Sequence, residues 1–524
     1  MNQVETIAAK LPPLVDAYIK QETETSELYD KSPDQTGLDK ACSELTNRSV
    51  NRNILVKVLI KQAKNSSFSN EQTLKQIDLL LNNDVATVTT GHQLCIYGGP
   101  MFFFYKILSV ISLSQKLNAQ GKKVVPVFWM ASEDHDFEEI NHIYTQGKKL
   151  QWTSTHKGPV GRMALNDLIE FKVQLKELFQ DLYSHKETIE ILDRIFSSEK
   201  NLSQSIRDFA YWIFADHGLV VIDADDARLK ALLIPVIQKE LFDSFSSRAV
   251  REQTEKIESL GHTSQVTPRD INLFWSKSGY RERIVKTEKG FATVDLEHTW
   301  TNDEIKRSVE QTPEYFSPNV ILRPLYQEII LPNIAYIGGP GETSYWLQLK
   351  KVFEDAMVPM PVVLIRDMFL LVESLTVKKV DQLNIKFSDI FQNRDELIKI
   401  LLRRKGTHEH IIESRQSMLE KEFAAMSHEL SEFDPSLEES SKAELKRLSN
   451  KLNNLKRKVI RADKRQNEVL LSRLDHVYDQ CFYDGAPQER MLNWLSFWGH
   501  PKQVFELLPM CNPLKAELKV VCLD

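Results

Sequence analysis

Short apolar runs alternate with amphipathic stretches over the first 370 residues of the chain. Residues 100–123 have the clearest helical pattern, because Pro100 suits a first turn and Gly121 suits an end. Strands that alternate with helices predict a parallel sheet with right-handed crossovers, so we expect an α/β fold with a Rossmann-like core. Five runs have the length and β-branched composition of buried strands, near 85–90, 124–130, 219–223, 334–338 and 361–366.

Two gaps between these runs are too long for simple crossovers. Residues 137–217 and 227–332 are therefore expected to be insertions in the core. Insertions that follow the carboxyl ends of strands commonly build or cover a ligand crevice. We expect a core domain over residues 1–380 that is interrupted at about these two places.

Long amphipathic helices are predicted after the core. Residues 395–478 contain one proline and one glycine, and a heptad seam runs over about 442–478. The acidic piece 431–441 would turn an earlier helix back on this seam. We expect an α-helical antiparallel coiled-coil domain over 381–495 that also forms a homodimer, followed by a C-terminal tail at 496–524. The first apolar residues of the seam are Leu445, Leu448, Leu452, Leu455, Val459 and Ala462.

Composition narrows the class of protein. The net charge of −6 gives no overall basic field, so nucleic acid is not the expected partner. Ten Lys or Arg lie between 442 and 465, but without interleaved aromatics they are typical of a solvated helix face. The five cysteines form no C-x-x-C pair, which favours a reducing cytoplasm. The N-terminus lacks a signal-peptide pattern, and no apolar run approaches the ~20 residues of a membrane helix.

A glycine-rich turn between the first strand and the helix at 100–123 is the first candidate site. It contains Gly91-His92-Gln93 and Gly98-Gly99-Pro100. Glycines let the backbone approach an anion, and the N–H groups of a helix start point toward it. His92 could donate to a phosphate in a transition state. The alternative is a tight structural turn with a hydrogen-bonded histidine.

Ionisable residues follow the second strand directly. Glu133-Asp134-His135-Asp136 come after the apolar run 124–130, with Asn141 and His142 close behind. Carboxylates at this place in an α/β fold can hold a magnesium ion, an amine or a sugar hydroxyl, and a histidine can move a proton. The alternative is a solvated loop with a helix cap.

A third candidate lies within residues 322–342. Arg323 stands among apolar residues, where it could clamp a carboxylate or phosphate at two points. Gly338-Gly339-Pro340-Gly341-Glu342 forms a second strand-to-helix turn, which could also be purely structural. The run 275–279, "WSKSG", resembles the lysine loop of class I aminoacyl-tRNA synthetases, but it lies in an insertion, so we treat the match as coincidence. Whether Lys277 reaches the site stays open.

The quoted residues together resemble one family. The runs "TGHQLCIYGGPMFFFYKI", "PVFWMASEDHDFEEINHI", "SPNVILRPLYQEIILPNIAYIGGPGETSYWLQLK" and "MPVVLIRD" are similar to those of the bacillithiol-biosynthesis cysteine-adding enzymes. The resemblance implies a core akin to class I cysteinyl-tRNA synthetases, connecting-peptide insertions and a dimerising coiled coil. It also implies the last step of bacillithiol biosynthesis, in which a ligase joins the cysteine carboxyl to the amine of glucosaminyl-malate.

The chain departs from the class I signature in two ways. Thr89-Thr90-Gly91-His92 lacks the first histidine of His-x-Gly-His, and no lysine loop follows the last core strand. ATP or another nucleotide is the expected activator, and which one stays open. We predict no zinc, because only Cys95 lies near the site. The rival interpretation is a nucleotide- or RNA-binding protein, similar to these synthetases but without ligase activity.

The resemblance and the residues together give each candidate a role. His92 would stabilise the activating phosphate, Asp134 or Asp136 would hold the cysteine ammonium or a sugar hydroxyl, and His135 would be the base. The substrate-binding candidates are Glu133, Asn141, His142, Arg323 (for the malate carboxylates), Tyr326, Gln327 and Glu342. The nucleotide-binding candidates are Gly91, Gln93, Gly98, Gly99, Gly338, Gly339 and Gly341.

Overall fold

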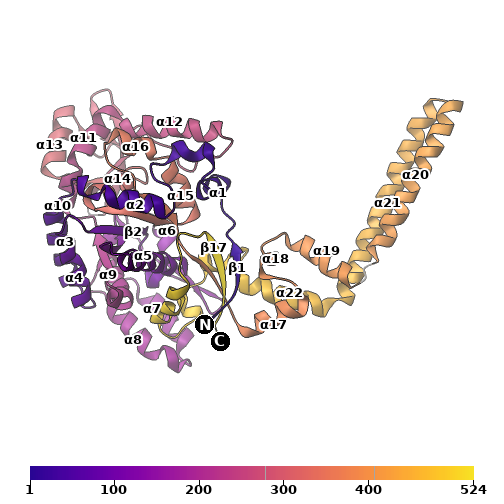
Figure 1. Ribbon diagram of the computed structural model, residues 1–524, viewed down its shortest axis with the longest axis horizontal. Coiled ribbons are helices and arrows are strands. Elements are labelled where there is room, and N and C mark those ends of the chain that lie inside the picture. Colours follow the sequence, from indigo (N-terminus) through magenta and orange to yellow (C-terminus); the bar gives the residue numbers. More distant parts are fainter. Residues whose placement is uncertain (278, 406–407, 524) are drawn as a thin grey trace. The chain divides into compact units, whose positions relative to one another are not determined.

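The chain folds into two compact units in a computed structural model, which describes residues 1–277, 279–405 and 408–523 (Figure 1). The larger unit comprises Ala8–Phe369 and Gln488–Lys519. The smaller unit comprises Met1–Ile7, Leu370–Pro487 and the chain end from Val520. Each unit is therefore built from segments that are far apart in the sequence.

A five-stranded parallel sheet forms the centre of the larger unit, with the strand order β13-β12-β2-β3-β6. Each of its strands is buried along its whole length. Near-continuous apolar runs are typical of parallel strands covered on both faces, and the predicted α/β core is confirmed. The strands are β2 (Ala86–His92), β3 (Val124–Met130), β6 (Val220–Asp223), β12 (Asn333–Gly338) and β13 (Val362–Ile365).

The register of the sheet brings the strand ends level with one another. His92 lies opposite Met130, and Met130 lies opposite Asp223. On the other side of the sheet, Gly338 lies opposite Ile365. We call this boundary the carboxyl edge. Side chains that follow the five strands meet here, where open α/β sheets bind ligands.

Helices cover the sheet because they carry apolar faces toward it. Helix α5 (Phe102–Ala119) packs on β2 and β3 and is buried on most sides, which is typical of a core helix. Val110 and Leu113 of α5 share one apolar cluster with Val88 and Leu364 of the sheet. The other α-helices of this unit outside the insertions are α1 (Pro13–Ile19), α2 (Gln35–Ser43), α3 (Arg52–Lys64), α4 (Glu71–Leu79), α15 (Pro340–Leu347), α16 (Lys350–Asp355) and the short α23 (Gln488–Met491).

Two inserted regions interrupt the core between its strands. The first follows β3 and contains α6 (Phe137–Ile140), the hairpin β4 (His142–Thr145) and β5 (Lys148–Gln151), α7 (Ile169–Phe179), α8 (Lys186–Ile195) and α9 (Leu202–Phe214). The second follows β6 and contains α10 (Ala227–Lys230), α11 (Ile234–Asp243), α12 (Phe245–Ser259), α13 (Asn302–Gln311) and α14 (Leu322–Ile330). It also holds an antiparallel sheet, ordered β10-β9-β8-β7-β11, of β7 (Leu273–Lys277), β8 (Tyr280–Thr287), β9 (Gly290–Thr293), β10 (Thr299–Trp300) and β11 (Phe316–Pro318).

Residues 488–519, which we call the return segment, rejoin the larger unit and hold the turn that precedes α5. This turn has left-handed backbone at Tyr97, Gly98 and Gly99, with φ of 51°, 82° and 57°. Asn493 Nδ2 donates to the carbonyl of Gly99 at 2.6 Å, and Trp494 Nε1 donates to that of Tyr97 at 2.9 Å. The return segment thus satisfies backbone carbonyls that no helix or strand would pair.

Gly98→Ala is expected to destabilise the protein by about 2–4 kcal/mol. A β-carbon at Gly98 would lie 2.8 Å from the Phe209 ring, and the backbone would be held in the left-handed region. Gly121→Ala is the matched control, because its φ is also 82° but nothing lies within 4 Å of the new carbon. Urea unfolding of both variants measures the difference. Equal losses would mean that the Phe209 contact relaxes at no cost.

The smaller unit contains part of a three-stranded sheet, ordered β1-β17-β14, a short antiparallel pair of β15 (Phe482–Tyr483) and β16 (Ala486–Pro487), and helices. In the described part of the chain, no helix combines the length and the apolar character needed to cross a membrane. The strands of the three-stranded sheet are β1 (Asn2–Ala8), β14 (Met368–Val372) and β17 (Glu517–Cys522). The helices are α17 (Ser374–Leu383), α18 (Phe387–Ile390), α19 (Arg394–Arg404), α20 (Glu409–Phe433), α21 (Ser436–Gln466) and α22 (Glu468–Cys481).

Helices α20 and α21 form the predicted antiparallel coiled coil, side by side along their length (Figure 1). Lys456 of α21 pairs with Glu413 of α20 at 2.7 Å across the hairpin. The seam is only partly covered by this pairing, since Leu455 is 46% exposed. Met418 of α20 is 56% exposed. The hairpin therefore leaves apolar surface that its own two helices do not cover.

Candidate active site

Buried positive charge gathers around Glu342 at the carboxyl edge. Lys106 of α5 forms an ion pair with this carboxylate and also donates to the carbonyl of Gly91 at 2.8 Å. Glu342 further accepts from the Tyr336 hydroxyl at 2.9 Å and from the Gly339 N–H at 2.8 Å. Burial raises the pKa of Glu342, but Lys106 and the Gly339 N–H outweigh it and hold that pKa below its ordinary value. The carboxylate is therefore ionised at neutral pH.

Two arginines flank this group, and each keeps one buried nitrogen without a hydrogen-bond partner among the described residues. Arg323 donates through Nη2 to the Tyr345 hydroxyl at 2.9 Å, while its Nη1 is unpaired. Gly91 makes room for it, because a β-carbon there would lie 3.4 Å from Nη1. Arg366 donates through both terminal nitrogens to Glu489, at 2.8 and 2.7 Å, while its Nε is unpaired.

Carboxylates that are paired with basic side chains lie on the other side of the carboxyl edge, after β3. Asp134 accepts from the His135 N–H at 2.8 Å and from Gln93 Nε2 at 3.3 Å, with Arg281 Nη1 3.9 Å away. Burial raises the pKa of Asp134, but the hydrogen bond from the His135 N–H and the charge of Arg281 outweigh it and hold that pKa well below its usual range. Asp134 is thus a stable anion next to Gln93.

Glu133 and Asp223 lie deeper on the same side. Glu133 pairs with Lys230, whose side chain is fully buried and also donates to the Phe316 carbonyl at 2.9 Å. Burial raises the pKa of Glu133, against the opposing charge of Lys230. Burial likewise raises the pKa of Asp223, which lies 3.4 Å from Arg207. These carboxylates are more easily protonated than Asp134, so the site holds carboxyl groups of differing acidity.

His92 ends β2 between the two charged sides. Its Nδ1 donates to the Gln93 carbonyl at 2.8 Å, and its ring lies 5.0 Å from that of Phe102 and 5.4 Å from that of Phe103. Burial and the charge of Lys106 lower the pKa of His92 to about 3, so the ring is neutral. Its Nε2 is buried and finds no partner in the described chain. In this tautomer Nε2 is a proton acceptor, whereas the predicted donation to a phosphate needs the other tautomer.

His135 lies at the mouth of the same side, with its side chain 49% exposed. Its Nδ1 accepts from Arg281 Nη1 at 2.6 Å. Nε2 therefore carries the ring proton, and Arg281 must withdraw before His135 can take a proton at Nδ1. The base role of His135 stays a prediction.

Several other candidates have structural partners instead of an open position. Asn141 is buried and contacts His142 Nδ1 at 3.0 Å, and Tyr326 donates to the Ala224 carbonyl at 2.8 Å. Gln327 is fully buried against Glu328. Asp136 is exposed. A β-carbon on Gly98 or Gly99 would meet Phe209 or Cys95, which is a packing reason for both glycines. The binding roles proposed for these residues stay predictions.

Comparison with known proteins places the chain in one family. Residues 1–367 match the description "Bacillithiol biosynthesis BshC, N-terminal Rossmann-like domain", and residues 369–523 match "Bacillithiol biosynthesis BshC, C-terminal coiled-coil domain". The chain belongs to the BshC family. Proteins named "Putative cysteine ligase BshC" are similar to it over nearly their whole length. That of Flavobacterium johnsoniae is 35% identical, covering 97% of each chain, and that of Cytophaga hutchinsonii is 33% identical, covering 97% of this chain and 96% of its own. The family makes this chain a ligase of bacillithiol biosynthesis.

Four charged residues of the BshC site were not among the sequence candidates. Lys106 is the single charge in residues 100–115, and Arg366 directly follows the fifth strand, so both carried a signal that could have been used. Lys230 and Arg281 come from the second insertion, where nothing in the local sequence points to the site. Their partners Glu133 and Asp134 were predicted.

A metal site would need several His, Cys, Asp or Glu side chains gathered around one point. In residues 1–277, 279–405 and 408–523, no group of three or more His, Cys, Asp or Glu side chains is arranged to hold a metal ion. The absence of zinc stays a prediction. Lys277 places its ammonium 5.7 Å from the centre of the Tyr315 ring, and Ser278 of the "WSKSG" run lies outside the described residues.

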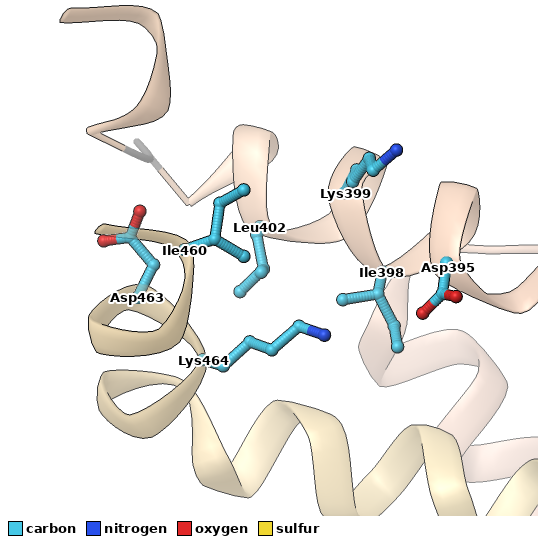
Figure 2. A pocket seen from close by; sticks show the side chains of 7 residues that line it. All are labelled: Asp395, Ile398, Lys399, Leu402, Ile460, Asp463 and Lys464. Atoms are coloured by element: carbon cyan, nitrogen blue, oxygen red, sulfur yellow. The ribbon is translucent and has the colours of Figure 1, made fainter. Parts of the chain in front are cut away.

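A separate hollow of about 190 Å³ lies in the smaller unit, between α19 and α21 (Figure 2). Ile398, Leu402 and Ile460 face one another across it, and Lys464 extends toward Ile398 (Figure 2). The hollow is smaller than the ~300 Å³ at which ligand pockets usually begin. We assign it to the packing of α19 on the coiled coil.

Asp134→Asn is expected to reduce turnover by about 10²-fold at neutral pH, because it removes the permanent anion beside Gln93. The folded-state pKa of Asp134 is depressed, so the stability it contributes is present above the unfolded value of ~3.9 and is lost as pH falls toward the folded value. The melting temperatures of the variant and the wild type should therefore converge below about pH 4. Glu139→Gln, in the same segment, is the control. A turnover equal to that of wild type would contradict the assignment.

Proposed function

We propose that this chain joins the carboxyl group of cysteine to the amine of glucosaminyl-malate, in the last step of bacillithiol biosynthesis. The names of its relatives support a cysteine substrate. The observation that carries the proposal is the excess of buried positive charge on one side of the carboxyl edge and the carboxylate Asp134 on the other. Lys106, Arg323 and Arg366 lie on the β12–β13 side of His92, while Glu133 and Asp134 lie on the β3 side.

This distribution of charge suits the two substrates. Cysteine carries an ammonium that the anion Asp134 would hold, and glucosaminyl-malate carries carboxylates that Arg323 would bind at two points. The amide forms between the carbonyl carbon of cysteine and the sugar nitrogen, which gives up a proton as the activated carboxyl oxygen leaves. The neutral His92 offers Nε2 as an acceptor for that proton.

A free carboxylate must be activated before an amine can displace its oxygen. ATP or another nucleoside triphosphate would supply the activating group when bound. The residues at the start of α15 fit such phosphates, because a β-carbon on Gly341 would meet nothing within 4 Å and Gly339 is only partly buried. Gly91 accepts from Lys106 through its carbonyl, and Gln93 donates to Asp134.

We also propose that the protein is a homodimer and that it works in the cytoplasm. The five cysteines are unpaired, which supports a reducing compartment. The exposed apolar surface at Leu455 and Met418 supports a second copy of the coiled coil as the partner.

Thiol profiling by mass spectrometry tests the function in a strain that lacks this protein. We expect bacillithiol to disappear and glucosaminyl-malate to accumulate, and expression of the wild-type chain to restore both levels. The purified protein, given cysteine, glucosaminyl-malate and ATP, should form the same thiol. Normal thiol pools in the deletion strain would refute the proposal.

A further inference from the structure

We propose that Arg366 and Arg323 form an oxyanion subsite beside the Lys106–Glu342 ion pair at the carboxyl edge, and that it binds a carboxylate or phosphate group of a substrate. The chemical class of the ligand follows from the structure alone. Its source, a malate carboxylate or a nucleotide phosphate, rests on the proposed function. Arg366 is the new element of this site. It was not among the candidates chosen from the sequence, and the description of the family names no residue.

Unsatisfied donors are the first argument. Arg366 is 4% exposed, and its Nε has no hydrogen-bond partner among the residues described. Arg323 Nη1 is also buried and also lacks a hydrogen-bond partner among the described residues. Buried N–H groups are nearly always paired in folded proteins, because an unpaired one loses its hydrogen bond to water without replacement. Two guanidinium groups with unpaired buried donors near the same Lys106–Glu342 pair therefore indicate an acceptor that is bound during function.

The balance of charge is the second argument. The group contains three cations, Lys106, Arg323 and Arg366, and two carboxylates, Glu342 and Glu489. One positive charge is left over in a buried place, where an unpaired charge is costly. A bound anion would neutralise it, and a neutral or cationic ligand would not.

The geometry is prepared for an anion in front of Arg366. Glu489 accepts from both terminal nitrogens of the guanidinium, Nη1 also donates to the Asp367 carbonyl at 3.0 Å, and Phe102 lies against it at 5.4 Å. Nε is therefore the guanidinium nitrogen that has no partner among the described residues. The backbone of Gly339 leaves that space open, because a β-carbon there would lie 3.9 Å from Nε. The N-terminus of α15 adds its own partial positive charge at the turn that contains Gly339.

Isothermal titration calorimetry of the full-length protein tests the subsite without requiring turnover. Malate and ADP are the two probes, titrated separately to millimolar concentration. Arg366→Gln removes the guanidinium, and Gly339→Ala keeps the Arg366–Glu489 pair but places a methyl group in front of Nε. Arg251→Gln, a surface arginine paired with Asp270, is the control for lost charge. We expect both test variants to weaken one probe at least about tenfold and the control to weaken neither.

The probe whose affinity falls identifies the chemical group that the subsite binds. Loss of malate affinity assigns the subsite to a carboxylate, and loss of ADP affinity assigns it to a phosphate. If Arg366→Gln does not fold, Gly339→Ala and the charge-neutral pair Arg366→Gln with Glu489→Gln give the answer. Wild-type affinity in all of these folded variants, or a wild-type protein that binds neither probe, would overturn the subsite. Thiol production in the strain test above is unaffected by this outcome, so a failure of the subsite and a failure of the proposed function can be told apart.

Discussion

His92→Asn is expected to lower thiol formation by about 10²-fold or more while the protein stays folded. Asparagine can place its amide N–H where Nδ1 donates to the Gln93 carbonyl, so the bond that orients the residue is kept. It has no atom at the position of Nε2, the buried acceptor between the two charged sides of the carboxyl edge. The variant therefore separates the chemical role of the ring from its structural role.

Two further substitutions complete the test. His92→Gln places a polar atom near the position of Nε2 and is expected to retain more activity than His92→Asn. His92→Ala is expected to be inactive and also less stable, because the ring packs on Phe102 and Phe103. The measurements are the rate of thiol formation and the melting temperature of each purified variant. An active His92→Asn enzyme would return His92 to a purely structural role.

Leu455→Asp is expected to convert the proposed homodimer into a monomer with an intact hairpin. Leu455 belongs to the heptad seam but is 46% exposed in a single chain, so a second copy would have to cover it. A carboxylate buried there without a partner costs several kcal/mol, which is enough to prevent association at micromolar concentration. Light scattering coupled to gel filtration gives the mass directly.

The double variant Leu448→Asp with Leu452→Asp should have a larger effect. Both leucines are half-buried within one chain, so the charges should disrupt the hairpin as well as the dimer. The expected result is a monomer whose helical region melts separately while the parallel sheet survives. Asn454→Asp, at an exposed position of the same helix, is the control. A wild-type chain that is monomeric across the micromolar range would contradict the dimer.

The sheet could be predicted because each of its strands is buried on both faces. That burial requires nearly continuous apolar runs, which stand out in the sequence, and the residues just after such runs lie at one edge. Asp134 and Glu342 were found in this way. Arg366 obeys the same rule, at the end of the fifth strand, and could have been found.

The remaining site residues depend on tertiary contacts that no local pattern encodes. Arg281 and Lys230 reach the carboxyl edge from the second insertion, and Glu489 arrives from the return segment, more than a hundred residues after Arg366. The protonation state of His92 could not be predicted either. Its low pKa comes from burial and from the charge of Lys106, one turn into α5. Gly98 belongs to a turn whose glycine-rich sequence is typical of anion binding, but the atoms next to Gly98 are those of the Phe209 ring.

The return segment also sets when the site can be completed during synthesis. A ribosome makes the parallel sheet first, then the coiled coil, and only afterwards Glu489, Asn493 and Trp494. Until these last residues emerge, Arg366 lacks its carboxylate partner and the left-handed turn at Tyr97 lacks its donors. A nascent chain that stops after the coiled coil is thus long enough to contain every strand of the sheet, yet it has no finished site. Prematurely terminated products should accordingly be inactive, and a working core without the coiled coil requires internal excision with a linker, not an earlier stop codon.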